Sequence, residues 1–149
     1  MNKKILILFA ALIASILYSE AAFAENLLQN SGFEDDTAWE INENWRITDE
    51  DAYTGQRCAV VNTEAEWFVL IKQPVDVKKN TEYILTYYAK TDTDWGIAAK
   101  IFNGAQENYQ SSGVAKSDDW RSNILKFNSG DNERIYVVFM GNGAVTYID

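Results

Sequence analysis

Residues 82–90 read EYILTYYAK, and this stretch decides the fold class. Tyr83, Leu85 and Tyr87 fall on one face of an extended chain, and the residues between them fall on the other. Alternation with a period of two is the pattern of a β-strand with one buried face. Residues 96–102 repeat the pattern, so at least two strands of this kind are expected here.

The rest of the chain carries more short runs of this type, with turns roughly every ten residues. Further strands are expected at residues 45–47, 58–61, 67–71, 75–77, 120–127, 134–140 and 145–149. A polar loop that carries Tyr109 is expected between two of them, and the single proline, Pro74, suits a strand edge or bulge. No helical periodicity competes over more than a turn or two. The pattern therefore predicts one antiparallel β-sandwich.

Residues 1–24 have the features of a secretory signal peptide. Lys3 and Lys4 precede an apolar run over residues 5–17, and Ala22-Phe23-Ala24 is a small-x-small cleavage site. The run is shorter than the ~20 residues that span a membrane. We therefore expect cleavage after Ala24, a single mature domain over residues 25–149, and a secreted or periplasmic protein without membrane attachment.

Charge and composition exclude several classes of function. The formal net charge is −9 at pH 7, and removal of the signal's two lysines and one glutamate makes it −10. Such a chain repels phosphate backbones, so nucleic acid is a poor partner. The sequence has no histidine and only one cysteine, Cys58. Histidine-dependent catalysis, histidine metal sites and an intrachain disulfide are therefore excluded.

Residues 26–35 read NLLQNSGFED and allow two interpretations. Two leucines lead into a polar turn, so both interpretations place a first strand here. In one, the strand runs into a solvated loop. In the other, Gly32 gives the turn conformational freedom, and Glu34 and Asp35 offer hard oxygen ligands to a cation. The residues alone leave this choice open.

Several short motifs follow one another over nearly the whole mature chain. They are the Asn-Leu-Leu-x-Asn-x-Gly-Phe-Glu opening, Trp45, the Tyr53-x-Gly55 turn, Gln73, Tyr83-x-Leu85-x-Tyr87, Trp120, Phe127 and a final Tyr147-Ile148-Asp149. Each is weak alone, but their order resembles the carbohydrate-binding modules of bacterial cellulases and xylanases, the group that contains families four, nine and twenty-two. The resemblance implies an all-β fold, an antiparallel jelly-roll β-sandwich of the galactose-binding-like type.

The same resemblance implies a structural calcium ion near the chain ends. Its ligands would be the carboxylates of Glu34 and Asp149 and the main-chain carbonyls of Gly32 and Gly55. Calcium takes roughly six to eight oxygen ligands of these kinds. The alternative is that both acids are ordinary surface residues of an acidic chain.

Two positions depart from the pattern of the group. Members commonly continue past the final-strand isoleucine as Asp-Asp-Val, whereas this sequence stops at Asp149. We expect a last strand that is either short or cut, and a terminal carboxylate that either adds a calcium ligand or frays. Some relatives pair a cysteine at the position of Cys58 with one in the last strand. Tyr147 occupies that stretch here, so Cys58 is expected to be a small buried apolar residue.

A sugar has polar hydroxyl edges and apolar C–H faces, so its site combines aromatic rings with amide or charged groups. The resemblance places such a site on the outward face of one sheet. If residues 83, 85 and 87 point inward, Tyr88 and its outward neighbours form that face, and the same parity adds Lys100. The candidate sugar-binding residues are Thr86, Tyr88, Lys90, Lys100, Tyr109 and Trp95, with Gln73 and Arg46 as weaker polar candidates.

The five tryptophans divide by their surroundings. Trp45, Trp67 and Trp120 are expected in the core, because large aromatic residues dominate sandwich interiors. Trp39 and Trp95 have polar neighbours and are expected on the surface as stacking candidates. For each outward tyrosine, the alternative to sugar binding is packing with the hydroxyl in water.

Three functions remain open. The favoured one is a secreted, non-catalytic module that binds a β-glucan or xylan-type polysaccharide, in the company of a glycoside hydrolase or a cell-surface protein. The second is a structural or protein-interaction sandwich that has lost sugar binding. The third, a glycosidase, needs two carboxylates about 5–10 Å apart across a sugar site. The small domain and the resemblance both argue against catalysis.

Overall fold

The structure, a computed structural model, describes residues 25–62, 69–94, 96–104, 108–141 and 145–149, and only the main chain of residues 69, 70, 108 and 109. These residues form ten β-strands and no helix, and none belongs to a helix that could span a membrane. The strands are β1 Glu40–Ile41, β2 Trp45–Thr48, β3 Cys58–Asn62, β4 Val69–Asp76, β5 Glu82–Thr91, β6 Ile97–Phe102, β7 Asn108–Gly113, β8 Ser117–Asn128, β9 Arg134–Gly141 and β10 Val145–Ile148.

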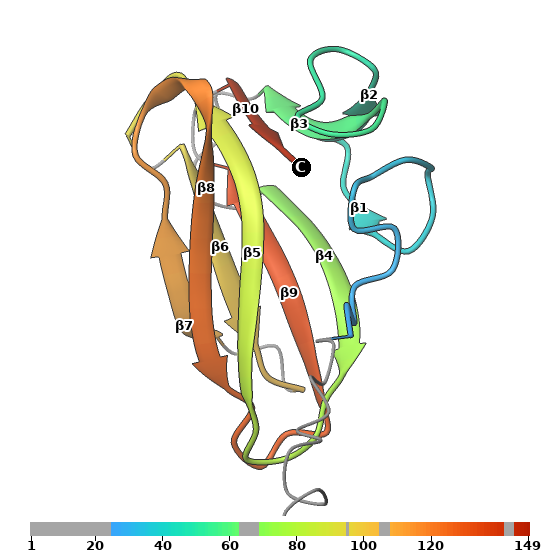
Figure 1. Cartoon of the computed structure of the whole chain (residues 1–149), viewed down its shortest axis with the longest axis vertical. Coiled ribbons are helices and arrows are strands. Elements are labelled where there is room, and N and C mark those ends of the chain that lie inside the picture. The colour runs from blue at the N-terminus through green and yellow to red at the C-terminus, as the bar shows by residue number, and fades with distance from the viewer. Residues whose placement is uncertain (1–24, 63–68, 95, 105–107, 142–144) are drawn as a thin grey trace, which may run out of the picture.

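The strands form two five-stranded antiparallel sheets that pack face to face (Figure 1). Sheet A has the order β1-β4-β9-β6-β7, and sheet B has the order β2-β3-β10-β5-β8. Successive strands often lie in different sheets, so the chain crosses the sandwich repeatedly, as in a jelly roll. The predicted all-β antiparallel jelly-roll sandwich is confirmed.

The core lies between the two sheets and consists of the inward residues of their strands. Leu85 and Tyr87 are buried, as their alternation predicted, and the Tyr87 ring meets Phe139 of sheet A edge-on at 5.1 Å between centroids. Trp45 is 4% exposed, so its predicted core position is confirmed. Burying one large apolar side chain contributes about 1.5–3 kcal/mol, so a core of this kind is the main source of stability.

Three local expectations are wrong. Leu27 and Leu28 belong to no strand, although the opening stretch was expected to begin with one. Residues 108–113 form β7 at the edge of sheet A, so Tyr109 lies in a strand and not in a polar loop. Residues 69–76 form one strand, where two short ones were expected.

Pro74 lies within β4 without breaking the sheet. Val77 donates its main-chain N–H to the carbonyl of Glu133 at 2.9 Å, so the odd-numbered residues here hydrogen-bond toward β9. Alternation then turns the nitrogen of Pro74 away from β9, toward the side where β1 pairs only with Ile71 and Lys72. The missing N–H therefore costs no ladder hydrogen bond, as expected for proline at a strand edge.

Candidate functional site

The predicted sugar-binding residues lie on opposite faces of the sandwich. β5 belongs to sheet B and turns Tyr88 and Lys90 outward, as alternation predicted. β6 belongs to sheet A and turns Lys100 outward on the far side. The expected grouping of Lys100 with Tyr88 is therefore wrong. Alternation decides whether a side chain points in or out, but it does not decide which sheet a strand joins.

The outward face of sheet A carries aromatic and basic side chains. Tyr136 of β9 is the register partner of Phe102 of β6, and both are half-buried. Side chains at directly opposed positions have Cβ atoms about 5 Å apart, so these two rings are neighbours. The next row across the same face carries Lys72 and Lys100, both register partners of β9. We call these four residues the sheet A face.

The ammonium of Lys72 is the best-defined charge on the sheet A face. Its Nζ atom lies 5.3 Å from the centroid of the Tyr136 ring and 3.2 Å from a carboxylate oxygen of Glu40. The cation–π contact and the ion pair hold the amine beside the ring. The face therefore presents apolar ring surface and hydrogen-bond donors together.

Sequence reasoning missed Tyr136 and Phe102 as ligand candidates, although each lies on the outward face of a clearly alternating strand. The missing information was the pairing of β9 with β6, which are about 35 residues apart in the chain. Tyr109 lies on β7, next to β6, but its side chain is outside the described residues. Trp95 and Trp67 are also outside them, as is the predicted signal peptide.

The outward face of sheet B is covered at one end by the β2–β3 loop, residues 49–57. Tyr53 of this loop stacks on Tyr88 with 3.8 Å between ring centroids. Trp120 lies 5.9 Å from Tyr53 and 6.4 Å from Tyr147, centroid to centroid. Tyr88 does point outward as predicted, but Tyr53 occupies its ring face, so it is no open platform. We call Tyr53, Tyr88, Trp120 and Tyr147 the sheet B cluster.

Lys90 lies within the sheet B cluster, with its side chain only 14% exposed. Its Nζ is 4.5 Å from the centroid of Tyr147 and 5.4 Å from that of Trp120, and it pairs with Asp51 of the covering loop. Burial lowers the pKa of this amine. The expectation of a core position for Trp120 is wrong, because it is half-buried on the outward face.

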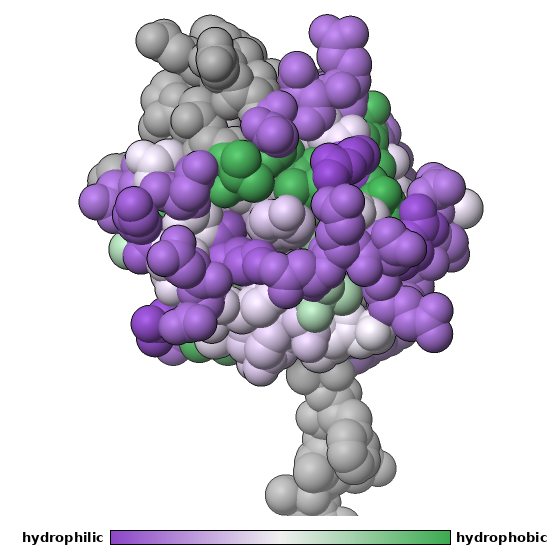
Figure 2. Space-filling model, turned by 90° about the horizontal axis from the view of Figure 1, so that it is seen from above, coloured by the Kyte–Doolittle hydropathy of each residue, from purple (hydrophilic) through white to green (hydrophobic). Residues whose placement is uncertain are grey.

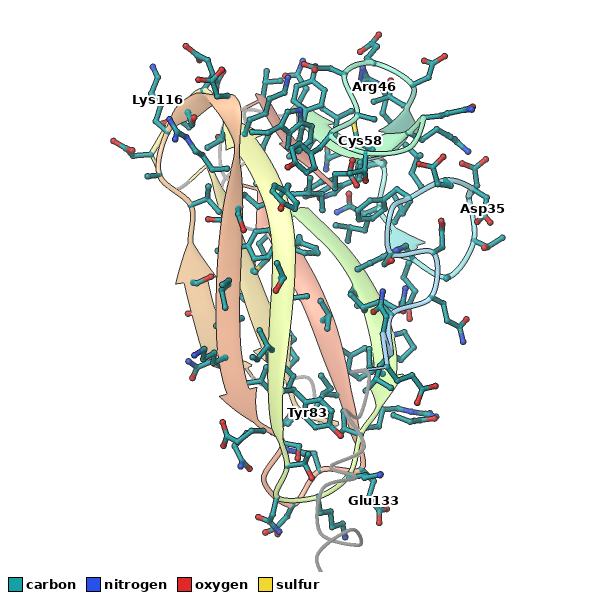
Figure 3. All side chains as sticks on the ribbon, in the orientation of Figure 1. Asp35, Arg46, Cys58, Tyr83, Lys116 and Glu133 are labelled. Carbon is teal, nitrogen blue, oxygen red and sulfur yellow. The ribbon has the colours of Figure 1, made fainter. Side chains whose placement is uncertain are left out.

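Figure 2 shows the end of the sandwich that carries this loop: hydrophilic side chains cover most of it, with a band of apolar ones between them. Figure 3 places Arg46 and Cys58 together at this end, far from Tyr83. Arg46, the weaker polar candidate, is paired with Glu50 at 2.9 Å on the covered side. It therefore lies on the opposite side of the molecule from Lys100.

Gln73 and Trp39 were expected to face a ligand or solvent, and both point inward. Gln73 is 3% exposed, and its amide exchanges two 2.8 Å hydrogen bonds with the main chain of Gln29. Trp39 is 7% exposed, packs against Phe33 at 4.9 Å between centroids, and donates from Nε1 to the carbonyl of Asn30. The opening segment lies outside any strand. The side chains of Gln73 and Trp39 therefore supply hydrogen bonds to its main chain that a neighbouring strand would otherwise provide.

The four residues implied as calcium ligands converge, and we call them the clasp. Gly55 has φ of 63°, and a Cβ atom there would lie 2.0 Å from Oε1 of Glu34. A Cβ on Gly32 would lie 3.9 Å from Oδ1 of Asp149 and 4.0 Å from Oε1 of Glu34. Both carboxylates therefore approach the same glycine, and a side chain at position 55 would be strained by its φ and would displace the Glu34 carboxylate.

The clasp carboxylates also hold the β2–β3 loop. Oδ2 of Asp149 accepts 2.8 Å hydrogen bonds from the N–H groups of Tyr53 and Thr54. Glu34 accepts from the N–H of Gln56 at 3.0 Å. Charge-assisted hydrogen bonds of this kind are among the stronger ones in proteins. The loop that covers sheet B is thus anchored by these two acids.

The donor chemistry of the clasp fits calcium, which prefers carboxylate and carbonyl oxygens. Among the described residues, no group of three or more acidic, cysteine or histidine side chains could hold a metal ion. A calcium ion would therefore depend on the two carboxylates together with main-chain carbonyls.

Cys58 is fully buried beneath the same loop, and its predicted burial is confirmed. Its Sγ donates to the carbonyl of Glu50 at 3.3 Å. Burial, with a smaller contribution from the charge of Asp149, raises the pKa of the thiol to about 11. A thiol in this state is a packing group and not a nucleophile.

No family model matches the sequence, and no curated protein matches it significantly. Solved structures do match. A family 61 carbohydrate-binding module, TmCBM61 in complex with β-1,4-galactotriose, superposes with a TM-score of 0.65 at 16% identity, over 85% of this chain and 95% of that one. A family 16 module superposes with a TM-score of 0.61 at 21% identity, over 83% and 96%. The chain has the fold of a carbohydrate-binding module.

The family 22 xylan-binding domain of Paenibacillus barcinonensis Xyn10C also matches, with a TM-score of 0.56 at 15% identity, over 75% of this chain and 81% of that one. The motif resemblance is thereby confirmed at the level of the fold. A fold of this kind hosts many ligands, so these similarities do not assign one to this chain.

Proposed function

We propose that this protein is a secreted, non-catalytic carbohydrate-binding module whose ligand lies on the sheet A face. The observation that carries the proposal is the neighbouring pair Tyr136 and Phe102, flanked by Lys72 and Lys100 on an outward sheet face. The rings offer apolar surface to the C–H face of a sugar, and the ammonium groups donate to its hydroxyls. The ligand class that we propose is a β-linked glucan or xylan-type polysaccharide.

The contrast between the two outward faces supports this choice. On sheet B, the ring of Tyr88 is stacked by Tyr53 and the amine of Lys90 is paired with Asp51. A sugar there would have to displace the loop. On sheet A, the rings of Tyr136 and Phe102 are half-buried, and the amine of Lys72 lies over Tyr136. Matched structures include modules described as binding xylan and in complex with galactotriose, which agrees with a sugar ligand.

Native gel electrophoresis through soluble β-glucan, xylan and galactan tests the proposal. We expect retardation in at least one of these gels. Tyr136→Ala should weaken binding about tenfold, which corresponds to roughly 1.4 kcal/mol and is of the size expected for an aromatic contact. Ile124→Ala, at a 58% exposed position on sheet B, is the matched control and should bind normally. No retardation across the panel would contradict sugar binding, and sustained release of reducing sugar would contradict a non-catalytic role.

We also propose that the clasp binds a structural calcium ion. When bound, the ion would neutralise the two acids and link the opening segment, the β2–β3 loop and β10. Carboxylates from Glu34 and Asp149 and carbonyls from Gly32 and Gly55 are the residues that would hold it. The convergence of both carboxylates on Gly32 supports this proposal.

Thermal unfolding with calcium and with a chelator tests the ion. We expect the chelator to lower the melting temperature and Glu34→Gln to abolish that dependence. Glu133→Gln is the matched control, because Glu133 is an exposed acid paired with Lys79 away from the clasp. A melting temperature that the chelator leaves unchanged would refute the calcium proposal.

Secretion and the companion protein complete the proposal. Expression with its own leader should yield a mature protein that begins at Glu25, as N-terminal sequencing would show. The partner that we propose is a glycoside hydrolase or a cell-surface protein, since a non-catalytic module acts by bringing another protein to the polysaccharide. An intact N-terminus after export would contradict the leader.

One observation favours a second function, protein interaction through sheet B. Ile84 is 63% exposed and Ile124 58% exposed, and they lie on neighbouring strands of the outward face. Isolated exposed apolar residues are normal, so two together are only a modest signal. Flat glycan arrays combined with crosslinking of a protein at position 124 would support this function over sugar binding.

A further inference from the structure

Two lysines on the outward side of sheet A lie in one row across three strands. Lys72 of β4 and Lys100 of β6 are both register partners of Val138 of β9, which lies between those strands (Figure 1). Neighbouring strands are about 4.8 Å apart, so the Cα atoms of the two lysines are roughly 10 Å apart. The two ammonium groups therefore approach the outward side from the two sides of β9.

The row of lysines lies beside the row of aromatic rings. Tyr136 and Phe102 form the next pair in the register of β9 and β6, about 7 Å farther along these strands. The side chain of Lys72 spans that distance, because its Nζ atom lies 5.3 Å from the centroid of the Tyr136 ring. A lysine ammonium of the first row thus reaches the edge of a ligand that lies on the rings.

The outward side of sheet A differs in charge from the chain as a whole. Among the described side chains that its strands turn outward, the basic ones are Lys72, Lys100 and Arg134, and the acidic ones are Glu40 and Asp76. The complete sequence has a net charge of −9. This side is therefore slightly positive on a strongly negative molecule.

A sugar bound to the sheet A face would shield these ammonium groups from water. Shielding a charge costs free energy unless a counter-charge is near, and a carboxylate on the ligand would offset that cost through a charge-assisted hydrogen bond. Lys72 already pairs with Glu40 at 3.2 Å, but the Glu40 side chain is 58% exposed, so the pair is a weak surface ion pair. A carboxylate of the ligand can therefore compete with Glu40 for Lys72.

We propose that the sheet A face recognises uronic acid residues, with the two rings on the neutral sugar backbone and Lys72 and Lys100 on the carboxylate. This inference rests on the proposed function, because it names the class of sugar that the same face binds. The rest of the protein is acidic and repels a continuous polyanion. The ligand is therefore a largely neutral β-linked polysaccharide that carries uronate side groups at intervals.

Calorimetric titration with two matched xylo-oligosaccharides tests the proposal. One carries a single glucuronate side group, and the other is the same molecule with that carboxylate reduced to an alcohol. We expect the acidic form to bind about tenfold more tightly, which is the size expected when two exposed ammonium groups meet one carboxylate. The preference should largely disappear at about 1 M salt, where the Debye length is only about 3 Å.

Variants that change charge locate the preference. The double variant Lys72→Gln with Lys100→Gln should lower the ratio of the two affinities from about ten to about one. Lys126→Gln is the matched control, because Lys126 is an exposed lysine on the outward face of sheet B, and it should leave the ratio unchanged.

Glu40→Gln tests the same site by a gain of preference. It removes the carboxylate that competes for Lys72, so it should raise the ratio of the two affinities about threefold. A gain of preference does not result from unfolding, so this variant keeps the test decisive if the double variant fails to fold.

Equal affinities for the two oligosaccharides would overturn this inference and leave sugar binding intact. A preference that the folded double variant retains would also overturn it, as would an unchanged ratio in Glu40→Gln. If neither oligosaccharide binds and no polysaccharide gel retards the protein, the proposed function itself fails, and this inference fails with it.

Discussion

On sheet A, Tyr136 and Phe102 lie side by side on an outward face, whereas on sheet B Tyr88 lies beneath Tyr53 of a loop. Both faces come from strands with the same alternating pattern, and both carry a lysine next to an aromatic ring. On sheet A the two rings are half-buried beside lysine side chains. On sheet B the pattern yields a cluster of stacked rings, of which Tyr53 is 44% exposed and the others are half-buried.

The difference comes from how the β2–β3 loop is anchored. The carboxylates of Asp149 and Glu34 accept hydrogen bonds from the main chain of the loop and hold it over sheet B. Once the loop is in place, it covers Tyr88, Lys90 and Cys58. An outward residue of sheet B is thus covered where the β2–β3 loop packs over it. The position of that loop depends on Glu34 and Asp149, which are distant from it in the sequence.

The largest effect on the free energy of unfolding is expected from a substitution that releases the β2–β3 loop from sheet B. Gly55→Ala places a Cβ 2.0 Å from a Glu34 carboxylate oxygen at a φ of 63°. Left-handed backbone and the clash together should cost about 3 kcal/mol of the free energy of unfolding, measured by denaturant titration. Gly104→Ala is the matched control, because its Cβ would meet only one atom, at 3.9 Å. Equal stability of the two variants would show that the clasp does not hold the loop.

The reactivity of the Cys58 thiol shows whether the β2–β3 loop stays closed in the unmodified protein. Its pKa of about 11, against an ordinary 9.0, should make alkylation of the folded protein near pH 8 about a hundredfold slower than in denaturant. Between pH 9 and pH 11 the folded state keeps a proton that the unfolded state loses, so this group lowers stability as the pH rises. Rapid alkylation of native protein would show that the loop opens readily.

Removing the ion pair on each face should lower the free energy of unfolding by less than Gly55→Ala does, and by different amounts on the two faces. Asp51→Asn leaves Lys90 charged and largely buried, and should cost about 1 kcal/mol after allowance for the exposure of Asp51. Asparagine tolerates the φ of 63° at this position, so the change isolates the charge. Glu40→Gln, which removes the ion pair with Lys72 on sheet A, should cost under about 0.5 kcal/mol. Denaturation of both variants at low salt compares them, and the reverse ranking would contradict the contrast.

The smallest effect is expected at the exposed part of sheet B. Ile124→Ser should change the free energy of unfolding by less than about 0.5 kcal/mol, because the side chain is 58% exposed. Thermal unfolding measures this directly. A large loss would mean that this part of sheet B is also covered in solution, which would extend the contrast over the whole face.

Much of the fold followed from local patterns. Alternation in residues 82–90 and 134–140 placed the right residues inward, because the period of two is a property of the single strand. Pro74 and the burial of Cys58 were also predicted correctly. The grouping of Gly32, Glu34, Gly55 and Asp149 came from the family resemblance, and the structure does bring these residues together.

The candidate sugar-binding residues were not predicted to divide between two faces. Lys100 was grouped with Tyr88 although the two lie on opposite sheets, and Gln73 was assigned to a ligand although its amide bonds the main chain of Gln29. Trp39 was expected on the surface and is buried, whereas Trp120 was expected in the core and lies half-buried on the outward face of sheet B. In each case the outcome depended on a partner far away in the chain, and neither composition nor spacing carries that information.

The sequence by itself determined that this chain forms an antiparallel sandwich and which side chains point inward, since both follow from periodicity along single strands. Only the tertiary structure decided which strands share a sheet and which outward face is covered. These depend on contacts between residues tens of positions apart, where pairing and packing, and not local propensity, set the free energy.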